Sequence, residues 1–261
     1  MLLVVTILFS SAPGFSVALQ PNTVPSVSSS LGIGDTQPQS IPILGVYPNH
    51  LVGLNIPPTP KWAHDIILNA SQVWNEAQLE FQKQYGGEVY RFIEASCCVN
   101  VEYATLPSGV MGLTTVAYSQ LPSDAVLGGV FSSVTVLLPP DIFGVAEPKD
   151  VMVAFLIVLH ELGHVLGLNE LVGTHDAMDM FIWENQGRIS TLDLFAVTHL
   201  ASLRNGVLPA LFIQLPNTIH YDGNYASLIE AHFLPHSHVS MNTGLVRRKR
   251  ALFGVKHAPL G

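Results

Sequence analysis

Two histidines and a glutamate stand in a pattern typical of a catalytic metal site. The stretch VLHELGHVL, residues 158–166, places His160 and His164 four positions apart, with Glu161 directly after the first histidine. On a helix, side chains four apart differ by about 40° in azimuth and about 6 Å along the axis, so both imidazoles can reach one zinc ion. Glu161 then points to the side of the metal, where it can take a proton from water and pass it to a leaving amine. The motif predicts two metal ligands and one catalytic base.

A third ligand has to come from outside this helix. Gly167 follows His164 by three residues and allows the chain to leave through a left-handed turn and return beneath the metal. Glu170 then stands at the third position, and a carboxylate oxygen can bind zinc at about 2.0–2.2 Å. His175 is the alternative, because imidazole is the preferred ligand type, but it leaves little chain before Met178, which we expect to form an apolar floor. The spacing favours Glu170 and keeps His175 open.

The motif lies at the end of the most apolar helix that the sequence predicts. This helix runs from about residue 148 to 166, and the segment Val151–Leu159 is apolar on nearly every face. A helix without a polar face must be covered on all sides. The HExxH pattern alone also occurs by chance, but the buried helix before it and the glycine and methionine after it favour a real site.

The elements around this helix alternate between helical and strand patterns. A helix is expected from Pro60 to about residue 85, because apolar residues recur at three- and four-residue spacings: Ala63, Ile66, Ile67, Ala70, Val73, Trp74, Ala77 and Phe81. Strands are predicted at His50–Ile56, Glu88–Ala95, Cys98–Leu106, Gly112–Ser119 and Ser132–Pro139. A last helix starts after Ser190, which with Asp193 fits a capping box, and should end at Gly206.

With these residues in register, the sequence resembles the metzincin zinc peptidases, and most of all their matrixin group. The metzincin pattern is H-E-x-x-H-x-x-G-x-x-H followed by a methionine turn. The matching positions here are His160, Glu161, His164, Gly167 and Met178, with Glu170 where the third histidine would stand. The resemblance covers about residues 44 to 205 and leaves both ends of the chain unexplained.

The resemblance implies an α+β fold with a twisted mixed five-stranded sheet, two helices over a zinc cleft and a small C-terminal helical subdomain. It also implies that the edge strand Gly112–Ser119 binds a peptide or protein substrate by strand addition. The expected function is a zinc-dependent endopeptidase that hydrolyses peptide bonds through a water activated by Glu161. The alternative is a catalytically inactive domain that binds metal or protein on the same fold.

Composition and the chain ends limit the partners and the location. Of 261 residues 11% are charged, the formal net charge is −8, and the one basic run, Arg247–Arg250, is short, so nucleic acid is not expected as a partner. The apolar segment 1–18 ends in small residues and predicts a secretory signal peptide, and hence a secreted protein without a membrane span after its removal. An uncleaved anchor or a buried strand is the alternative. We expect a Ser/Pro-rich linker over 19–43, the catalytic domain over 44–205 and an extension without an assigned role over 206–261.

The chain contains two cysteines, Cys97 and Cys98, which are adjacent. They cannot build a spaced disulfide framework or a CxxC zinc knuckle. They could close a vicinal disulfide, but the sequence pattern favours small apolar residues in a strand.

Overall fold

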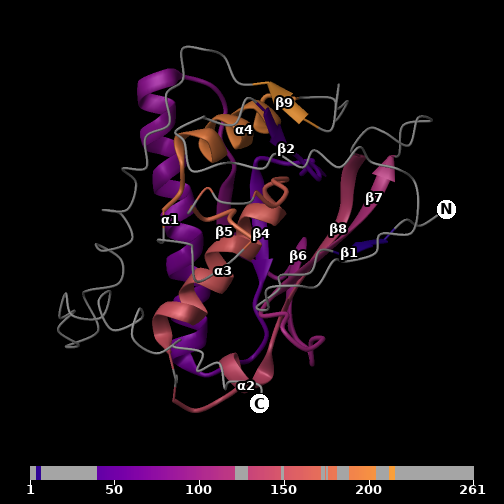
Figure 1. Ribbon diagram of the computed structural model, residues 1–261, viewed down its shortest axis with the longest axis vertical. Coiled ribbons are helices and arrows are strands. Elements are labelled where there is room, and N and C mark those ends of the chain that lie inside the picture. Colours follow the sequence, from indigo (N-terminus) through magenta and orange to yellow (C-terminus); the bar gives the residue numbers. More distant parts are fainter. Residues whose placement is uncertain are drawn as a thin grey trace, which may run out of the picture.

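The structure is a computed structural model. It describes residues 4–6, 40–120, 129–147, 150–171, 174, 176–180, 188–203 and 212–214. These residues form a mixed α/β fold in which the helices gather on one side of a mostly parallel β-sheet (Figure 1). No helix in these ranges is long and apolar enough to cross a bilayer.

The main sheet has the strand order β1-β7-β8-β6-β4-β5, and β3 pairs with β8 outside this path. Its strands are β1 (Val4–Thr6), β3 (Gly45–Val46), β4 (Leu51–Asn55), β5 (Arg91–Glu94), β6 (Val99–Tyr103), β7 (Leu113–Gln120) and β8 (Gly129–Leu138). The pairs β4/β5, β4/β6, β6/β8 and β3/β8 are parallel, whereas β7 is antiparallel to both β8 and β1. A second sheet joins β2 (Ser40–Pro42) to β9 (Phe212–Gln214).

The prediction of five strands was wrong for this sheet, which has seven. The five predicted strands are present as β4, β5, β6, β7 and β8, and β1 and β3 are the additional ones. Segments of two or three residues are too short to carry an alternating pattern, so their pairing depends on the neighbouring strand. Strand β1 lies within the predicted signal segment, and β2 lies within the predicted linker.

Helix α1 (Lys61–Tyr85) forms where the apolar spacing predicts it, and its eight predicted core residues are all buried. Pro60 precedes its first turn, and Gly86 ends the helix with a φ of 77°, a conformation that glycine adopts without a steric penalty. Trp74 reaches across to helix α3 (Val151–Val165), where its Nε1 donates a hydrogen bond to the carbonyl oxygen of Leu159 at 2.9 Å. This buried contact fixes the two long helices against each other.

Helix α4 (Thr191–Ala201) begins at the predicted capping box. The Ser190 hydroxyl accepts from the Asp193 amide at 3.1 Å, and the Asp193 carboxylate accepts from the Ser190 amide at 3.0 Å. The helix ends at Ala201 rather than at the predicted Gly206, because the Ser202 hydroxyl donates to a carbonyl of the last turn. Between α3 and β8 lies one turn of helix, α2 (Pro140–Phe143).

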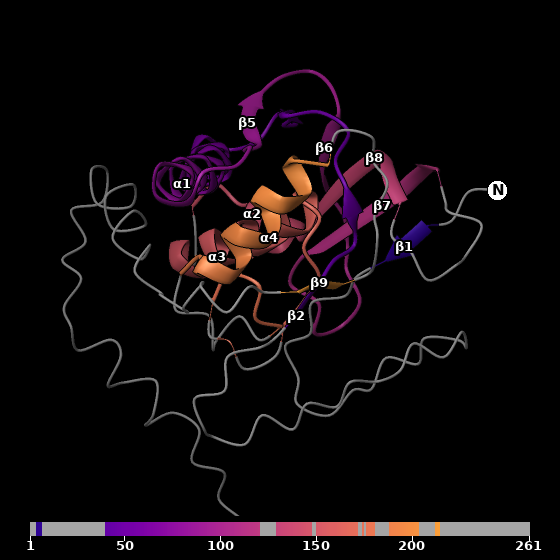
Figure 2. The same cartoon turned by 90° about the horizontal axis from the view of Figure 1, so that it is seen from above.

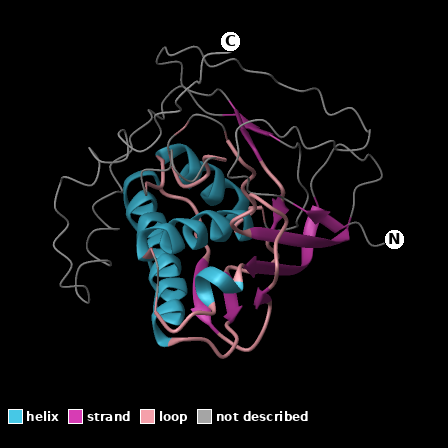
Figure 3. Cartoon of the chain, turned by 60° about the horizontal axis from the view of Figure 1, so that its bottom comes forward, coloured by secondary structure: helices cyan, strands magenta, loops and turns pink. Residues whose placement is uncertain are grey.

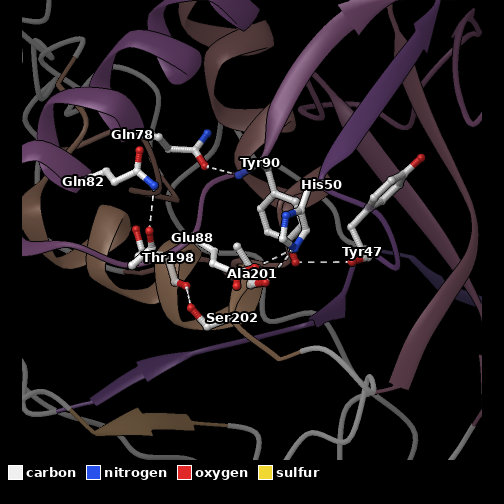
Figure 4. A network of polar contacts seen from close by, with 10 residues as sticks. Tyr47, His50, Gln78, Gln82, Glu88, Tyr90, Thr198, Ala201 and Ser202 are labelled. Carbon is white, nitrogen blue, oxygen red and sulfur yellow. Dashed lines mark hydrogen bonds and ion pairs between the residues drawn. The ribbon is translucent and has the colours of Figure 1, made fainter.

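A polar network joins the end of α4 to β4 and α1 (Figure 4). His50 Nε2 lies 3.0 Å from the carbonyl oxygen of Ala201 and 3.1 Å from a carboxylate oxygen of Glu88. On the α1 side, the Tyr90 amide donates to the Gln78 side chain at 2.9 Å. These contacts hold the end of α4 against the residue that precedes β4.

Candidate metal centre

Helix α3 carries the predicted site and is buried along most of its length. Asp150 caps its start by accepting a hydrogen bond from the Val153 amide at 3.0 Å. Because α1 packs on one side and strands β7 and β8 lie on another, the site side chains are almost inaccessible: His160, Glu161 and His164 are exposed by 1% or less. The residues packed around α3 therefore exclude water from these three ionisable side chains.

Hydrogen bonds to backbone carbonyl oxygens set the tautomer of both histidines. His160 Nδ1 lies 2.8 Å from the carbonyl oxygen of Ala177, and His164 Nδ1 lies 3.0 Å from that of Leu168. A carbonyl oxygen can only accept, so Nδ1 carries the proton in each ring and Nε2 keeps its lone pair. This arrangement is the one that histidine ligands of metals usually adopt.

The two lone pairs face one point in space. The Nε2 atoms of His160 and His164 are 3.0 Å apart, close to the distance of about 3.3 Å between two ligand atoms of a tetrahedral zinc ion. Two unprotonated nitrogens cannot hydrogen-bond to each other. A cation between them is the arrangement that satisfies both.

The third residue of the group is Glu170. The candidate ligand atoms of His160, His164 and Glu170 all lie within 4.8 Å of one another. One oxygen of Glu170, Oε1, is buried and has no hydrogen-bond partner among the described residues. A buried carboxylate oxygen without a partner is costly, and coordination of a cation would remove that cost. His175, the alternative ligand, lies outside the described residues.

Gly167 makes the return of the chain to the metal centre possible. Its φ is 98°, and its amide donates to the carbonyl oxygen of His164 at 3.0 Å. A Cβ atom at this position would lie 2.2 Å from the carbonyl oxygen of Gly45, so only glycine fits. The predicted exit turn after the helix is therefore present, and it leads the chain back toward Glu170.

Met178 lies fully buried against α3. Its sulfur lies so close to Gly163 that a Cβ atom there would approach it to 2.2 Å. The Met178 amide donates to the Asp176 carboxylate at 3.1 Å. The turn thus places Met178 against the helix between the two histidine positions and presents the Ala177 carbonyl to His160.

The side chain of Glu161 extends from α3 to the start of β7. The Thr114 hydroxyl donates to Glu161 Oε2 at 2.6 Å, whereas Oε1 has no hydrogen-bond partner among the described residues. Gly112 packs so closely that a Cβ atom there would be 2.4 Å from Oε1. One carboxylate oxygen is therefore held by a hydrogen bond, and the other is buried without a hydrogen-bond partner among the described residues.

The sequence pattern did not identify Thr114 or Gly112 as site residues. Leu113 and Thr114 are both buried, so the strand does not alternate here, and nothing local distinguishes Thr114 from Thr115. Contact with Glu161 spans 47 positions of the chain and depends on how α3 crosses the sheet.

Burial shifts the pKa values of the two histidines and of Glu161 and Glu170 in the direction that favours the neutral form of each side chain. It lowers the pKa of His164 to about 4, and burial followed by the proximity of His164 lowers the pKa of His160 well below its usual value. Burial raises the pKa of Glu161 to about 8, with the Thr114 hydrogen bond opposing and Glu170 adding to the shift, and burial raises that of Glu170 to about 8. A bound divalent cation would favour the carboxylates and neutral imidazoles together, which is the donor set that zinc takes.

Replacing Thr114 by valine tests the contact between β7 and Glu161. We expect a reaction that uses Glu161 as its base to slow by about 10- to 100-fold, which corresponds to about 1.5–3 kcal/mol for a hydrogen bond to a charged group. The rate should rise with pH as Glu161 loses its proton. The hydrogen bond lowers the pKa of Glu161, so its loss should move this rise to higher pH. The matched control is Thr135→Val, because Thr135 lies on the neighbouring strand β8 and pairs with β7 without being part of the contact with Glu161. Equal profiles for both variants would exclude a role for Thr114.

The candidate metal centre is supported by its geometry alone. No protein-family model matches the chain, and a search of curated proteins found no match. The assignment therefore rests on the tautomers of His160 and His164 and on their approach to Glu170.

Proposed function

We propose that this protein is a zinc-dependent endopeptidase. The observation that carries the proposal is the position of Glu161. It follows the candidate ligand His160 on α3, it interacts electrostatically with the candidate ligand Glu170, and its carboxylate accepts a hydrogen bond from Thr114 of β7. A mixed sheet with one antiparallel strand beside the glutamate is also what the metzincin resemblance implies. A secreted location belongs to the same proposal.

His160, His164 and Glu170 would hold the zinc. When bound, zinc supplies Lewis acidity, which polarises a substrate carbonyl and lowers the pKa of water. Glu161 would take the proton from the attacking water through Oε1, the carboxylate oxygen that Thr114 does not occupy, and return it to the leaving amine. Its raised pKa suits this exchange, because a base of low pKa would not hold the proton between the two steps.

The outer edge of β7 is the proposed binding site for the peptide substrate. The prediction that Gly112–Ser119 is an edge strand was wrong, because β1 pairs antiparallel with Thr115, Val116 and Ala117 on this side of β7. The pairing supports the capacity of β7 to accept an added strand, and a bound peptide would take the place of β1 (Figure 3). The residues that contact Glu161, Gly112 and Thr114, lie immediately before this paired segment. A peptide in the same orientation would bring a peptide bond to the carboxylate as it passes the start of β7.

An apolar hollow of about 600 Å³ continues from the start of β7. It is lined by residues 105–111 and 139–142, among them Met111, Val110 and Ile142. An added antiparallel strand runs opposite to β7, so its C-terminal part heads toward this hollow. The hollow would therefore receive an apolar side chain on the C-terminal side of the cleaved bond.

Removal of the metal is the first test of the proposal. Purified protein is incubated with an unfolded protein substrate, with and without a chelator, and fragments are measured by mass spectrometry. We expect cleavage that falls to background with the chelator and returns when zinc is added back. Stoichiometric zinc without any cleavage would favour the alternative, a catalytically inactive metal-binding or protein-binding domain.

A further inference from the structure

The adjacent cysteines lie in an exposed bend between β5 and β6, not in a strand (Figure 2). The prediction that Cys98 starts the strand was wrong, because β6 begins at Val99. Cys98 has a φ of 85°, and it is the one non-glycine residue with a positive φ in the described part of the chain. Both cysteines are exposed in this bend and do not pack as small apolar residues of a strand.

The bend is anchored to β4 by its backbone. The Ala95 amide donates to the Leu54 carbonyl at 3.0 Å. The Cys97 thiol lies against Gly53, where a Cβ atom would be 3.0 Å from the sulfur and 2.9 Å from the Cys97 carbonyl oxygen. Gly53 thus leaves room for the bend, which positions the Cys97 thiol before any reaction takes place.

The two thiols and the phenol of Tyr47 influence one another's ionisation. Burial and, after it, the nearby Cys98 thiol raise the pKa of Tyr47, and the Cys98 thiol also raises the pKa of Cys97. In Figure 4 the Tyr47 ring points away from the polar network at the end of α4, so its hydroxyl is not used there. The two cysteines are therefore adjacent in the chain, exposed to a small molecule and close enough to the Tyr47 phenol to affect its ionisation.

We propose that Cys97 and Cys98 form a redox-active site that closes a vicinal disulfide with a small-molecule disulfide as oxidant. The chain has 2 cysteines in 261 residues, so any disulfide within one chain is this one. This inference does not depend on the metal centre or on proteolysis.

The reaction is two successive thiol–disulfide exchanges. The thiolate of one cysteine attacks a sulfur of glutathione disulfide, which forms a mixed disulfide and releases one glutathione thiolate. The thiolate of the other cysteine then attacks the protein sulfur of that mixed disulfide and releases the second glutathione. Two protein thiols are oxidised, one glutathione disulfide is reduced to two glutathione molecules, and the two thiol protons end on the glutathione thiolates.

The chain geometry makes this disulfide a reversible one. Adjacent Cα atoms are about 3.8 Å apart, below the usual range of about 4.4–6.8 Å, so the eight-membered ring is tight and readily reduced. It closes a loop of two residues, which constrains the unfolded chain very little. The disulfide is therefore a redox response and not a device for stability. Contact with Cys98 raises the pKa of Cys97, so closure should become faster as the pH rises.

The test is equilibration of the reduced full-length chain in glutathione buffers, followed by acid quenching and intact-mass measurement. We expect the wild-type protein to lose two hydrogens without accumulating a glutathione adduct. Cys97→Ser and Cys98→Ser should each stop at one bound glutathione, because no second thiol can displace it. The folded chain should close the ring with an equilibrium constant at least about tenfold higher than the chain in denaturant, because the bend holds the thiols together.

Three outcomes would overturn the proposal. The first is a wild-type protein that accumulates mixed disulfides as the single-cysteine variants do. The second is a dimer linked through cysteine under the same buffers. The third is equal ring closure in the folded and denatured chains, which would show that the bend contributes nothing. The two variants each keep one exposed cysteine and should give the same result. A folding defect in one variant would therefore appear as a difference between the two.

Discussion

Replacing Glu161 by glutamine is expected to reduce peptide hydrolysis by about 10²- to 10⁴-fold, the usual contribution of a general base, while zinc stays bound. Glutamine has nearly the same shape, so it can keep the contact with Gly112 and accept the hydrogen bond from Thr114. It cannot take up a proton at neutral pH. The rate is measured as kcat/KM on a quenched fluorescent peptide, and the metal content is measured on the same sample.

The control for this experiment is Glu102→Gln, since Glu102 is an exposed glutamate of β6 away from the site. It should leave both the rate and the zinc content unchanged. Undiminished hydrolysis by the Glu161 variant would refute the assignment of Glu161 as the base. Loss of zinc together with loss of activity would instead give the carboxylate a structural role at the centre.

The second large effect concerns the third ligand. Glu170→Ala should weaken zinc binding by more than about 100-fold, because even residues that only support a ligand contribute about 10- to 100-fold to metal affinity. His175→Ala should keep stoichiometric zinc. Titration of both metal-free variants with zinc, against a competing chromophoric chelator, measures the two affinities directly.

The result decides between the two residues. Retention of zinc by Glu170→Ala and its loss in His175→Ala would make His175 the ligand and overturn the choice of Glu170. The variant Glu170→His is a useful companion, because it places an imidazole at the same position. If the position is a ligand position, this variant should bind zinc, as a site with three histidines does.

Local patterns in the sequence predicted the helices well. The spacing of apolar residues placed α1, and the pairing of Ser190 with Asp193 placed the start of α4. Both depend on residues within one or two turns of each other, so they are visible without the rest of the fold. The relation of His160 to His164 is of the same kind, since one turn of helix sets it.

Contacts between distant segments were not predictable in this way. Thr114 reaches Glu161 because β7 lies beside α3, and no local pattern marks that hydroxyl. The short strand β1 pairs with β7 across more than a hundred positions, so the number of strands was underestimated. The cysteines illustrate the same limit: Cys98 has a positive φ and both cysteines are exposed in a bend, which the sequence pattern did not indicate.

The sequence by itself determined that two imidazoles and a carboxylate share one helix turn, because a fixed helical repeat sets their directions. The tertiary structure decided everything that makes this turn a site. It buried the helix, supplied the carbonyls of Ala177 and Leu168 that set the tautomers, and brought Glu170 within reach. The physical reason is that a helix specifies only its own geometry, whereas desolvation, proton positions and the third ligand depend on which segments pack around it.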